Sequence, residues 1–279
     1  MPASLDQIVA ATRRRIAGTK PAADLCQLER QAGSHVPRGF RRGLESKRHN
    51  GIAVIAELKR ASPSRGLIRS DFDSAGLAQE LEAAGAAALS VLTDEEFFQG
   101  SLENLRRASA STKLPCLRKD FIVDEFQLLE ARANAADAVL LIVAALSPEE
   151  LKLLAGRAAE YGLDVLCEVH DEEELRRAED AGCTLIGVNS RDLRTFKVDL
   201  ETAFRLADSI PKAALRVAES GINNGTDIAR LRAAGYHAFL IGESLMKATS
   251  PGEALKGLLA EALRESHALI SADQPCTSN

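Results

Sequence analysis

The sequence of 279 residues lacks tryptophan, and its aromatic residues amount to only 4%. Its five cysteines include no CxxC pair, which argues against both a zinc site and a disulfide framework. No apolar run reaches the roughly 20 residues of a membrane-spanning helix. The net charge of −5 argues against nucleic acid as the main partner. We therefore expect a soluble, cytoplasmic protein that holds no metal ion and binds neither nucleic acid nor membranes.

From residue 52 onward the chain alternates short apolar runs with longer helical patterns. Runs such as AVLLIV at 138–143 are apolar throughout, as is typical of strands buried on both faces of a parallel sheet. The eight expected strands begin near residues 52, 88, 115, 138, 163, 185, 215 and 238. The helical patterns that follow them cover residues 74–84, 102–111, 124–135, 148–161, 171–181, 200–209, 226–234 and 252–266.

Eight such units predict one α/β domain, a (β/α)8 TIM barrel, because right-handed crossovers close a set of this kind into a barrel. The 46% of hydrophobic residues can fill one core of that size. We expect the barrel at residues 49–268, an N-terminal helical extension at 1–48 and a disordered polar tail at 269–279.

The extension begins with an amphipathic pattern over residues 4–17. Ser4 and Gln7 have the spacing of a capping box, and an apolar stripe is formed by Leu5, Ile8, Val9 and Ile16. The run of arginines at 13–15 is expected on the solvated face of this helix. The pattern leaves open whether the extension covers the mouth of the barrel or only its side.

Polar residues stand where the expected strands end. Three pairs lie two positions apart, so both members share one face of a strand. Since the active site of a (β/α)8 barrel lies at the carboxyl ends of its strands, these residues predict an active site, although mutual ion pairing would be the structural alternative. The pairs are Glu57/Lys59, Lys119/Phe121 and Asn189/Arg191, and other strand ends add Glu168, Glu219 and Ser220.

Two glycines follow the last two expected strands. Gly221 lies in AESGI at 218–222, and Gly242 lies in LIGES at 240–244. Loops after the seventh and eighth strands of such barrels often bind phosphate, because backbone N–H groups can approach the anion closely. We therefore expect a small, phosphorylated substrate.

The segment IAELKRASPSRG at 55–66 closely resembles the signature of the indole-3-glycerol phosphate synthase family, and the likeness extends over residues 50–247. Further matching segments are LSVLT at 89–93, FQGS at 98–101, RKDFIV at 118–123, IGVNSRDL at 186–193, AESGI at 218–222 and FLIG at 239–242. The resemblance implies a (β/α)8 barrel with an N-terminal helical extension. It also implies a cofactor-free lyase of tryptophan biosynthesis, which converts 1-(2-carboxyphenylamino)-1-deoxyribulose 5-phosphate to indole-3-glycerol phosphate with loss of carbon dioxide and water.

The resemblance also implies roles for the charged residues. Lys119 would protonate the ketone oxygen while the aromatic carbon attacks, and we expect Arg118, Lys59 or burial to lower its pKa and so improve the transfer. Glu168 would act as acid and base in the later steps, with Glu57 and Lys59 as a second pair; how they divide these steps stays open. The implied catalytic set is Glu57, Lys59, Lys119, Glu168, Asn189 and Glu219.

A binding set follows from the same resemblance. Lys59 would also hold the substrate carboxylate, while Asn189 and Arg191 would orient the ribulose part. Phe98 and Phe121 would supply apolar walls for the anthranilate ring. The phosphate would be held by Ser62, Gly221, Gly242 and the backbone N–H of Glu243, whose carboxylate must turn away from it. The whole implied set is Ser62, Phe98, Phe121, Arg191, Ser220, Gly221, Leu240, Gly242 and Glu243.

Some residues and properties lie outside the resemblance. His170, His237 and Cys167 match no catalytic position, and we assign them to packing or to the surface. The oligomeric state is not encoded in any pattern that we find. We expect a monomer or a weak homo-oligomer.

Two other functions fit part of the pattern. A lysine at a strand end also suits an aldolase, in which Lys119 would form a Schiff base with a ketose phosphate. A barrel that only binds phosphate is a second alternative. It is disfavoured because Lys119, Glu168 and Glu57 are all present.

Overall fold

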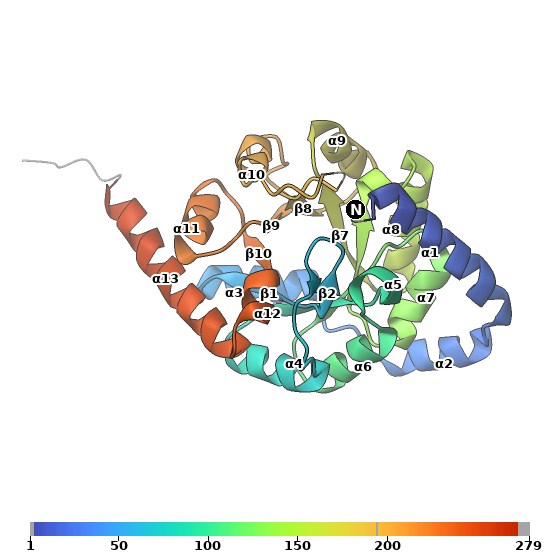
Figure 1. Ribbon diagram of the computed structural model, residues 1–279. Helices are drawn as coiled ribbons and strands as arrows, with labels where there is room; N and C mark the ends of the chain where they lie inside the picture. Colours follow the sequence, from blue (N-terminus) through green and yellow to red (C-terminus); the bar gives the residue numbers. More distant parts are fainter. Residues whose placement is uncertain (1–2, 194, 273–279) are drawn as a thin grey trace, which may run out of the picture.

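Eight parallel strands pair side by side until the last meets the first, and this closes the sheet into a barrel (Figure 1). The computed structural model describes residues 3–193 and 195–272. Each strand begins within one residue of its predicted position, and the prediction of a (β/α)8 TIM barrel is confirmed. The barrel strands are β1 (Ala53–Leu58), β4 (Ala88–Leu92), β5 (Cys116–Lys119), β6 (Ala138–Ile142), β7 (Asp164–Val169), β8 (Leu185–Asn189), β9 (Leu215–Glu219) and β10 (Ala238–Ile241).

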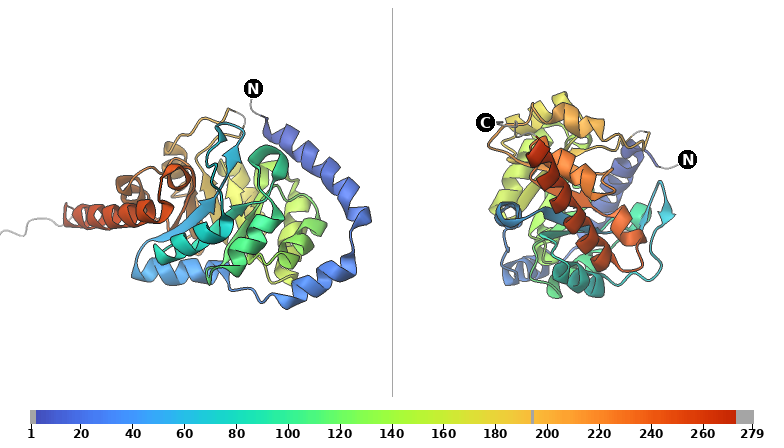
Figure 2. Two further views of the ribbon diagram at one scale, coloured as in Figure 1. Left: turned by 60° about the horizontal axis from the view of Figure 1, so that its bottom comes forward. Right: turned by 90° about the vertical axis from the view of Figure 1, so that its left-hand side faces the viewer.

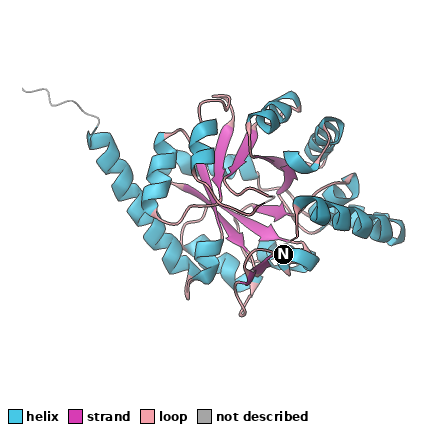
Figure 3. Ribbon diagram, turned by 45° about the horizontal axis from the view of Figure 1, so that its top comes forward, coloured by secondary structure: helices cyan, strands magenta, loops and turns pink. Residues whose placement is uncertain are grey.

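Helices alternate with these strands and surround the barrel (Figure 3). Several begin at a side-chain cap: Asp73, Ser101 and Ser147 each accept a hydrogen bond from a backbone N–H of the first turn. None of the helices in the described part of the chain is long and apolar enough to cross a membrane. The helices are α4 (Ser74–Ala83), α6 (Leu102–Ala110), α7 (Glu125–Ala133), α8 (Pro148–Glu160), α9 (Glu172–Asp180), α10 (Glu201–Leu206), α11 (Gly225–Ala233) and α13 (Pro251–Ala272).

The last helix is longer than its sequence pattern suggests. Because α13 continues to Ala272, residues 269–272 are helical and do not belong to the disordered tail that we predicted. The rest of that predicted tail, residues 273–279, lies outside the described residues.

Short elements that the sequence did not reveal occupy the loops after the strands. A two-stranded hairpin follows β1, and short helices follow β4, β6 and β10. Their side chains and backbone form part of the rim around the carboxyl ends of the strands. They are β2 (Ala61–Ser62), β3 (Gly66–Leu67), α5 (Glu95–Phe98), η2 (Val143–Ala145) and α12 (Glu243–Lys247).

Strand side chains are buried on both sides of the sheet. Ile55, Leu117 and Leu140 belong to the cluster inside the barrel, whereas Val54 and Val139 belong to the cluster between the strands and the helices. This alternation explains why the strand sequences are apolar throughout.

The N-terminal extension runs along one side of the barrel and reaches both of its ends (Figure 2). Phe40 and Leu44 of its last helix are fully buried and pack on the cluster inside the barrel. The first helix has the predicted capping box between Ser4 and Gln7. The extension consists of α1 (Leu5–Thr19), η1 (Lys20–Ala22), α2 (Leu25–Ser34) and α3 (Phe40–Asn50).

The arginines of α1 were expected on its solvated face, and Arg13 and Arg14 are exposed, whereas Arg15 is only partly exposed. Arg13 pairs with Glu150 at 2.8 Å, and Arg15 lies 3.9 Å from the buried carboxylate of Asp120. Both contacts join α1 to the outside of the barrel, so this face of the helix is partly an interface.

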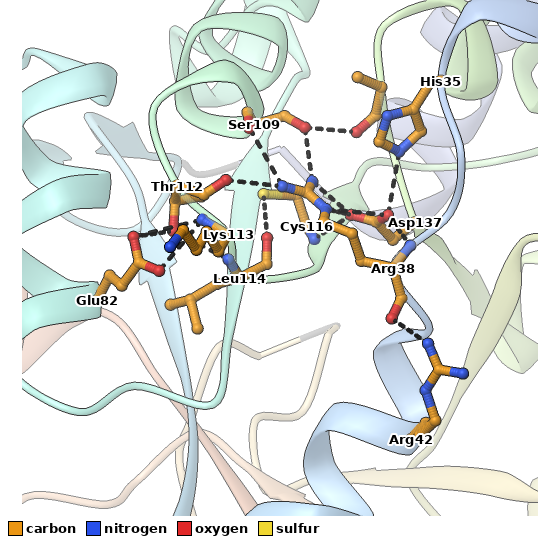
Figure 4. Close-up of polar contacts among 11 residues, drawn as sticks. His35, Arg38, Arg42, Glu82, Ser109, Thr112, Lys113, Leu114, Cys116 and Asp137 are labelled. Carbon is orange, nitrogen blue, oxygen red and sulfur yellow. Dashed lines mark hydrogen bonds and ion pairs between the residues drawn. The ribbon is translucent and has the colours of Figure 1, made fainter.

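A buried carboxylate at the amino ends of the strands hydrogen-bonds the segment of the extension between α2 and α3 (Figure 4). Asp137, directly before β6, is fully buried and accepts hydrogen bonds from Arg38 Nη2 at 2.6 Å, His35 Nε2 at 3.0 Å and the Cys116 N–H at 2.7 Å. Burial raises the pKa of this carboxyl, but the bonds from His35 and Arg38 hold it below its usual value. The charge of Asp137 is therefore compensated by the extension itself.

Candidate active site

A cavity of about 440 Å³ opens at the carboxyl ends of the barrel strands. Every residue that the sequence assigned to the site lines this cavity, which shows that the positions converge and leaves their individual roles as predictions. These residues are Glu57, Lys59, Ser62, Phe98, Lys119, Phe121, Glu168, Asn189, Arg191, Glu219, Ser220, Gly221, Leu240, Gly242 and Glu243.

Four charged side chains form one layer at the floor of the cavity. Glu57, Lys119, Glu168 and Glu219 come from β1, β5, β7 and β9, and alternate strands of such a barrel place their inward side chains at one level. Lys119 Nζ lies 2.9 Å from Glu168 Oε2 and 3.1 Å from Glu219 Oε2. One amine therefore bridges two carboxylates that are each 1% exposed.

Burial and close charges shift the pKa values of this layer. Burial alone would lower the pKa of Lys119, but Glu168, Glu219 and Glu57 raise it well above its usual value. Burial raises the pKa of Glu168, yet Lys119 and His170 bring it down to about 2. The pKa of Glu219 is raised to about 7, chiefly by burial and with Glu168 adding to it against the opposing effect of Lys119. The two carboxyl groups on Lys119 thus differ in protonation near neutral pH.

The cationic neighbours expected to lower the pKa of Lys119 do not do so. Arg118 is fully buried on the other face of β5, where it pairs with Asp120 at 2.8 Å and donates to the Gln127 carbonyl at 2.7 Å. Adjacent residues of a strand point to opposite faces, so Arg118 cannot face the cavity together with Lys119. Lys59 instead pairs with Glu57, at 2.5 Å.

Asn189 connects the carboxylate layer to the loop after β8. Its side chain hydrogen-bonds Glu168, and its Oδ1 accepts the backbone N–H of Arg191 at 3.0 Å. The second bond fixes the amide so that its NH₂ group can donate a hydrogen bond to Glu168. Asn189 therefore orients Glu168 from the neighbouring strand.

One wall of the cavity is apolar. The rings of Phe98 and Phe121 lie 6.1 Å apart between centroids and are tilted by 38°. Leu5 and Ile8 of α1 line the same cavity, so the extension reaches the mouth as well as the side of the barrel. No signal in the sequence joined these two residues to the site, because their contact with it depends on how α1 packs.

A second part of the cavity wall carries backbone and cationic groups suited to an anion. Ser62, Ser220, Gly221 and Gly242 line it, and Ser220 and Gly221 have the left-handed φ values of 64° and 81°. Two consecutive residues of this kind turn the chain sharply after β9.

Glu243 forms ion pairs with three cationic side chains beside this wall. Its carboxylate lies 2.6 Å from Lys247 Nζ, 3.0 Å from Arg65 Nε and 3.5 Å from Arg191 Nη2. Burial raises the pKa of Glu243, but Lys247, Arg65 and Lys59 lower it overall. Arg65 and Lys247 were not among the predicted site residues, and their positive charges belong to the cavity.

The arrangement suits proton transfer to and from a substrate with a flat apolar part and an anionic end. An amine and three carboxylates meet between an aromatic wall and a cationic wall. Within the described residues, no three His, Cys, Asp or Glu side chains are grouped so that they could hold a metal ion.

The chain is similar to one family of enzymes over most of its length. A family model described as indole-3-glycerol phosphate synthase matches residues 5–258. Indole-3-glycerol phosphate synthase from Koribacter versatilis is 59% identical over 259 residues, which cover 93% of this chain and 100% of that protein. The protein of the same description from Burkholderia ambifaria is 48% identical over 252 residues, covering 90% and 97%.

Solved structures with low sequence identity share the fold. Thiamine phosphate pyrophosphorylase from Pyrococcus furiosus matches with a TM-score of 0.58 and 18% identity, covering 78% of this chain and 98% of that one. A mandelate oxidase variant matches with a TM-score of 0.57 and 19% identity over 78% of this chain and 74% of its own. At such identities the likeness extends to the barrel architecture alone.

Proposed function

This chain belongs to the indole-3-glycerol phosphate synthase family, and on that premise we propose that it closes the indole ring of 1-(2-carboxyphenylamino)-1-deoxyribulose 5-phosphate. The product is indole-3-glycerol phosphate, and carbon dioxide and water leave. The observation that supports this most is the position of Lys119, bonded to two buried carboxylates between an aromatic and a cationic wall.

We infer one orientation of the substrate in the cavity from the groups that line it. Its anthranilate ring lies against Phe98 and Phe121, with its carboxylate near Lys59. Its phosphate lies against Ser62 and the turns at Gly221 and Gly242, where N–H groups and the charges of Arg65, Arg191 and Lys247 attract it. The ketone is then brought to Lys119.

Lys119 gives its proton to the ketone oxygen as the aromatic carbon attacks. The raised pKa of Lys119 keeps it charged before the reaction. An alkoxide that forms as the new bond closes is more basic than an amine, so the transfer remains favourable without a lowered lysine pKa. The carboxylates of Glu168 and Glu219 hold the ammonium group in place until that moment.

The later steps need both an acid and a base. Loss of carbon dioxide restores the aromatic ring, after which a hydroxyl group leaves as water and a proton leaves the neighbouring carbon. Glu168, with its low pKa, is suited to take up that proton, and Glu219, half protonated near neutral pH, is suited to give one. Glu57 with Lys59 forms a further pair within the same cavity.

A Schiff-base mechanism at Lys119 is less favourable. The attacking lysine must be neutral, and three carboxylates raise the pKa of this amine instead of lowering it. Trapping with borohydride in the presence of a ketose phosphate tests this point, because a Schiff base leaves a permanent adduct on Lys119.

The proposal includes a cytoplasmic location and a monomer or weak homo-oligomer. The described cysteines, Cys26, Cys116, Cys167 and Cys183, are free thiols, as a reducing compartment allows. Large exposed apolar side chains such as Leu25, Leu153 and Leu263 lie on separate helices. Light scattering after size exclusion measures the oligomeric state.

The test is a fluorescence assay for indole formation on the purified chain, with the carboxyphenylamino-deoxyribulose phosphate, a metal chelator and no added cofactor. We expect indole-3-glycerol phosphate, detected by its fluorescence, and carbon dioxide to form in equal molar amounts. A folded sample that binds inorganic phosphate but releases neither product contradicts the proposal and favours a barrel that only binds phosphate.

A further inference from the structure

A second, polar cavity of about 620 Å³ lies directly beside the active site. Leu5, Asn189 and Leu193 line both cavities, so a single layer of side chains separates them. His170 lines the second cavity, two residues after Glu168 in the loop that follows β7.

The ring of His170 is held between two carboxylates. Its Nδ1 lies 2.9 Å from Glu174 Oε2, and its Nε2 lies 3.5 Å from Glu168 Oε1. Glu174 also accepts the backbone N–H of His170 at 2.8 Å, which keeps this carboxylate an acceptor. Nδ1 therefore carries a hydrogen, and Nε2 is the nitrogen that can gain or lose a proton.

The geometry at Nε2 is unusual for a residue that only packs. This nitrogen is buried and makes no hydrogen bond to the described residues, although the side chain as a whole is 14% exposed. The other oxygen of Glu168, Oε2, is bonded to Lys119. Glu168 is thus shared between Lys119 on the active-site side and His170 on the side of the second cavity.

The proposed reaction, on which this inference rests, consumes one proton from solvent in each turnover. The negative charge of the substrate carboxylate disappears when neutral carbon dioxide leaves, and a hydroxyl group leaves as neutral water. Glu168 is 1% exposed and has a pKa of about 2, so alone it is seldom protonated near neutral pH. A group that stores a proton beside it would remove this limitation.

We propose that His170 is a positioning residue that stores this proton for Glu168. In the resting enzyme the proton is bound to Nε2 and points toward the carboxylate of Glu168. The N–H bond breaks with its electron pair left on nitrogen as an O–H bond forms at Oε1, and Glu168 passes a proton from Oε2 to Lys119 after that amine has given its own proton to the ketone. When Glu168 accepts a proton from the substrate, the transfer runs back to Nε2.

The surroundings of His170 fit this role. Burial lowers its pKa, but Glu174, Glu168 and Glu219 raise it above the usual value, so the ring is charged over more of the neutral range. Glu174 fixes the ring from α9, so the charged edge stays directed at Glu168.

The test compares His170→Gln and His170→Ala with the unchanged chain in the indole assay. Glutamine keeps a donor near the position of Nε2 but cannot store a proton. We expect kcat to fall by about 10², the low end for acid–base catalysis, while KM stays nearly unchanged. In His170→Ala the vacated space adjoins the second cavity, so added imidazole is expected to restore turnover in proportion to its concentration.

Three controls separate the outcomes. His237→Gln changes a histidine that lines neither cavity, and it should leave kcat unchanged. Thermal unfolding verifies that the His170 variants are folded, and imidazole should not stimulate the unchanged chain. If the unchanged chain turns over and His170→Gln keeps its kcat, or if folded His170→Ala gains nothing from imidazole, the inference is wrong. If the unchanged chain itself is inactive, the proposed function fails first.

Discussion

Gly242 leaves the space that the carboxylate of Glu57 occupies. A Cβ atom on Gly242 would lie 2.5 Å from Glu57 Oε1 and 2.8 Å from Glu57 Cβ. The φ value of Gly242 is −132°, so its backbone does not require glycine. The glycine that the sequence assigned to phosphate binding is therefore also needed for packing between β10 and the layer of four charged side chains.

Gly242→Ala is expected to displace Glu57 and disturb its bond to Lys59. Because a shift of about 1 Å in a catalytic group can cost ~10² in rate, we expect kcat/KM to fall by about that factor. Gly156→Ala in α8, where a Cβ meets nothing within 4 Å, is the matched control and should leave the kinetics unchanged. Normal kinetics in Gly242→Ala would mean that the position of Glu57 matters little.

Lys119→Met should lower kcat by at least about 10², with a smaller effect on substrate binding. The change removes the proposed proton donor and leaves the carboxylates of Glu168 and Glu219 without their cation. Thermal unfolding has to accompany the steady-state kinetics, since loss of one partner of a buried ion pair also destabilises the fold. Lys152→Met on the exposed face of α8 is the control. A folded Lys119→Met variant with near-normal turnover would refute the assignment of the proton donor.

Glu243→Gln is expected to strengthen phosphate binding. The carboxylate of Glu243 neutralises part of the charge of Arg65, Arg191 and Lys247, and an amide frees those cations for the ligand. Partly exposed charge pairs are worth up to about 1 kcal/mol, so the Kd for inorganic phosphate should fall by roughly two- to fivefold. Titration calorimetry measures this, with Glu253→Gln in α13 as the control. Weaker binding by Glu243→Gln would show that this carboxylate supports the site.

The barrel and the cluster of site residues were predictable because they follow from local rules. Continuous apolar runs mark buried parallel strands, and the positions that end them converge by the geometry of the fold. Lys119, Glu168 and Asn189 line one cavity for this reason. The same spacing of two residues separates Glu168 from His170, although His170 matches no catalytic position of the family.

Contacts between distant segments were not predictable. The wall formed by Leu5 and Ile8 depends on where α1 packs, and the pairing of Glu243 with Arg65 depends on a hairpin with only two residues in each strand. The sequence predicts the wrong direction for the pKa of Lys119 because Arg118, although adjacent in the chain, lies on the other face of β5. Adjacent strand residues face apart, so carboxylates from other strands determine the charge around Lys119.

Arg38→Met should destabilise the whole domain through its buried partner. The change leaves Asp137, which is fully buried, with fewer donors, and breaking a buried ion pair costs about 3 kcal/mol or more. Urea unfolding measures the difference in the free energy of unfolding. Arg42→Met is the matched control, because the Arg42 guanidinium donates to the Arg38 carbonyl at the surface (Figure 4). Equal stability of the two variants would mean that water replaces the bonds from Arg38.

Glu219→Gln should change how stability depends on pH. The pKa of Glu219 is raised from 4.5 to about 7 in the folded chain, chiefly by burial. Between these values the folded state keeps a proton that the unfolded state releases, so stability falls as pH rises through this window, by up to ~3 kcal/mol. The amide of Glu219→Gln cannot ionise, so this loss is absent in the variant. The pKa of Glu168 is lowered to about 2, so its titration affects stability only below the window.

Urea unfolding at intervals from about pH 4.5 to above pH 7 tests this expectation. The free energy of unfolding of Glu219→Gln, relative to that of the unchanged chain, should increase with pH across the window and level off above it. Glu253→Gln, which changes an exposed carboxylate, should show a constant difference. If the Glu219→Gln difference is also constant, Glu219 ionises in the folded chain at its ordinary pKa, and it is no better suited than Glu168 to give the proton that the departing hydroxyl group requires.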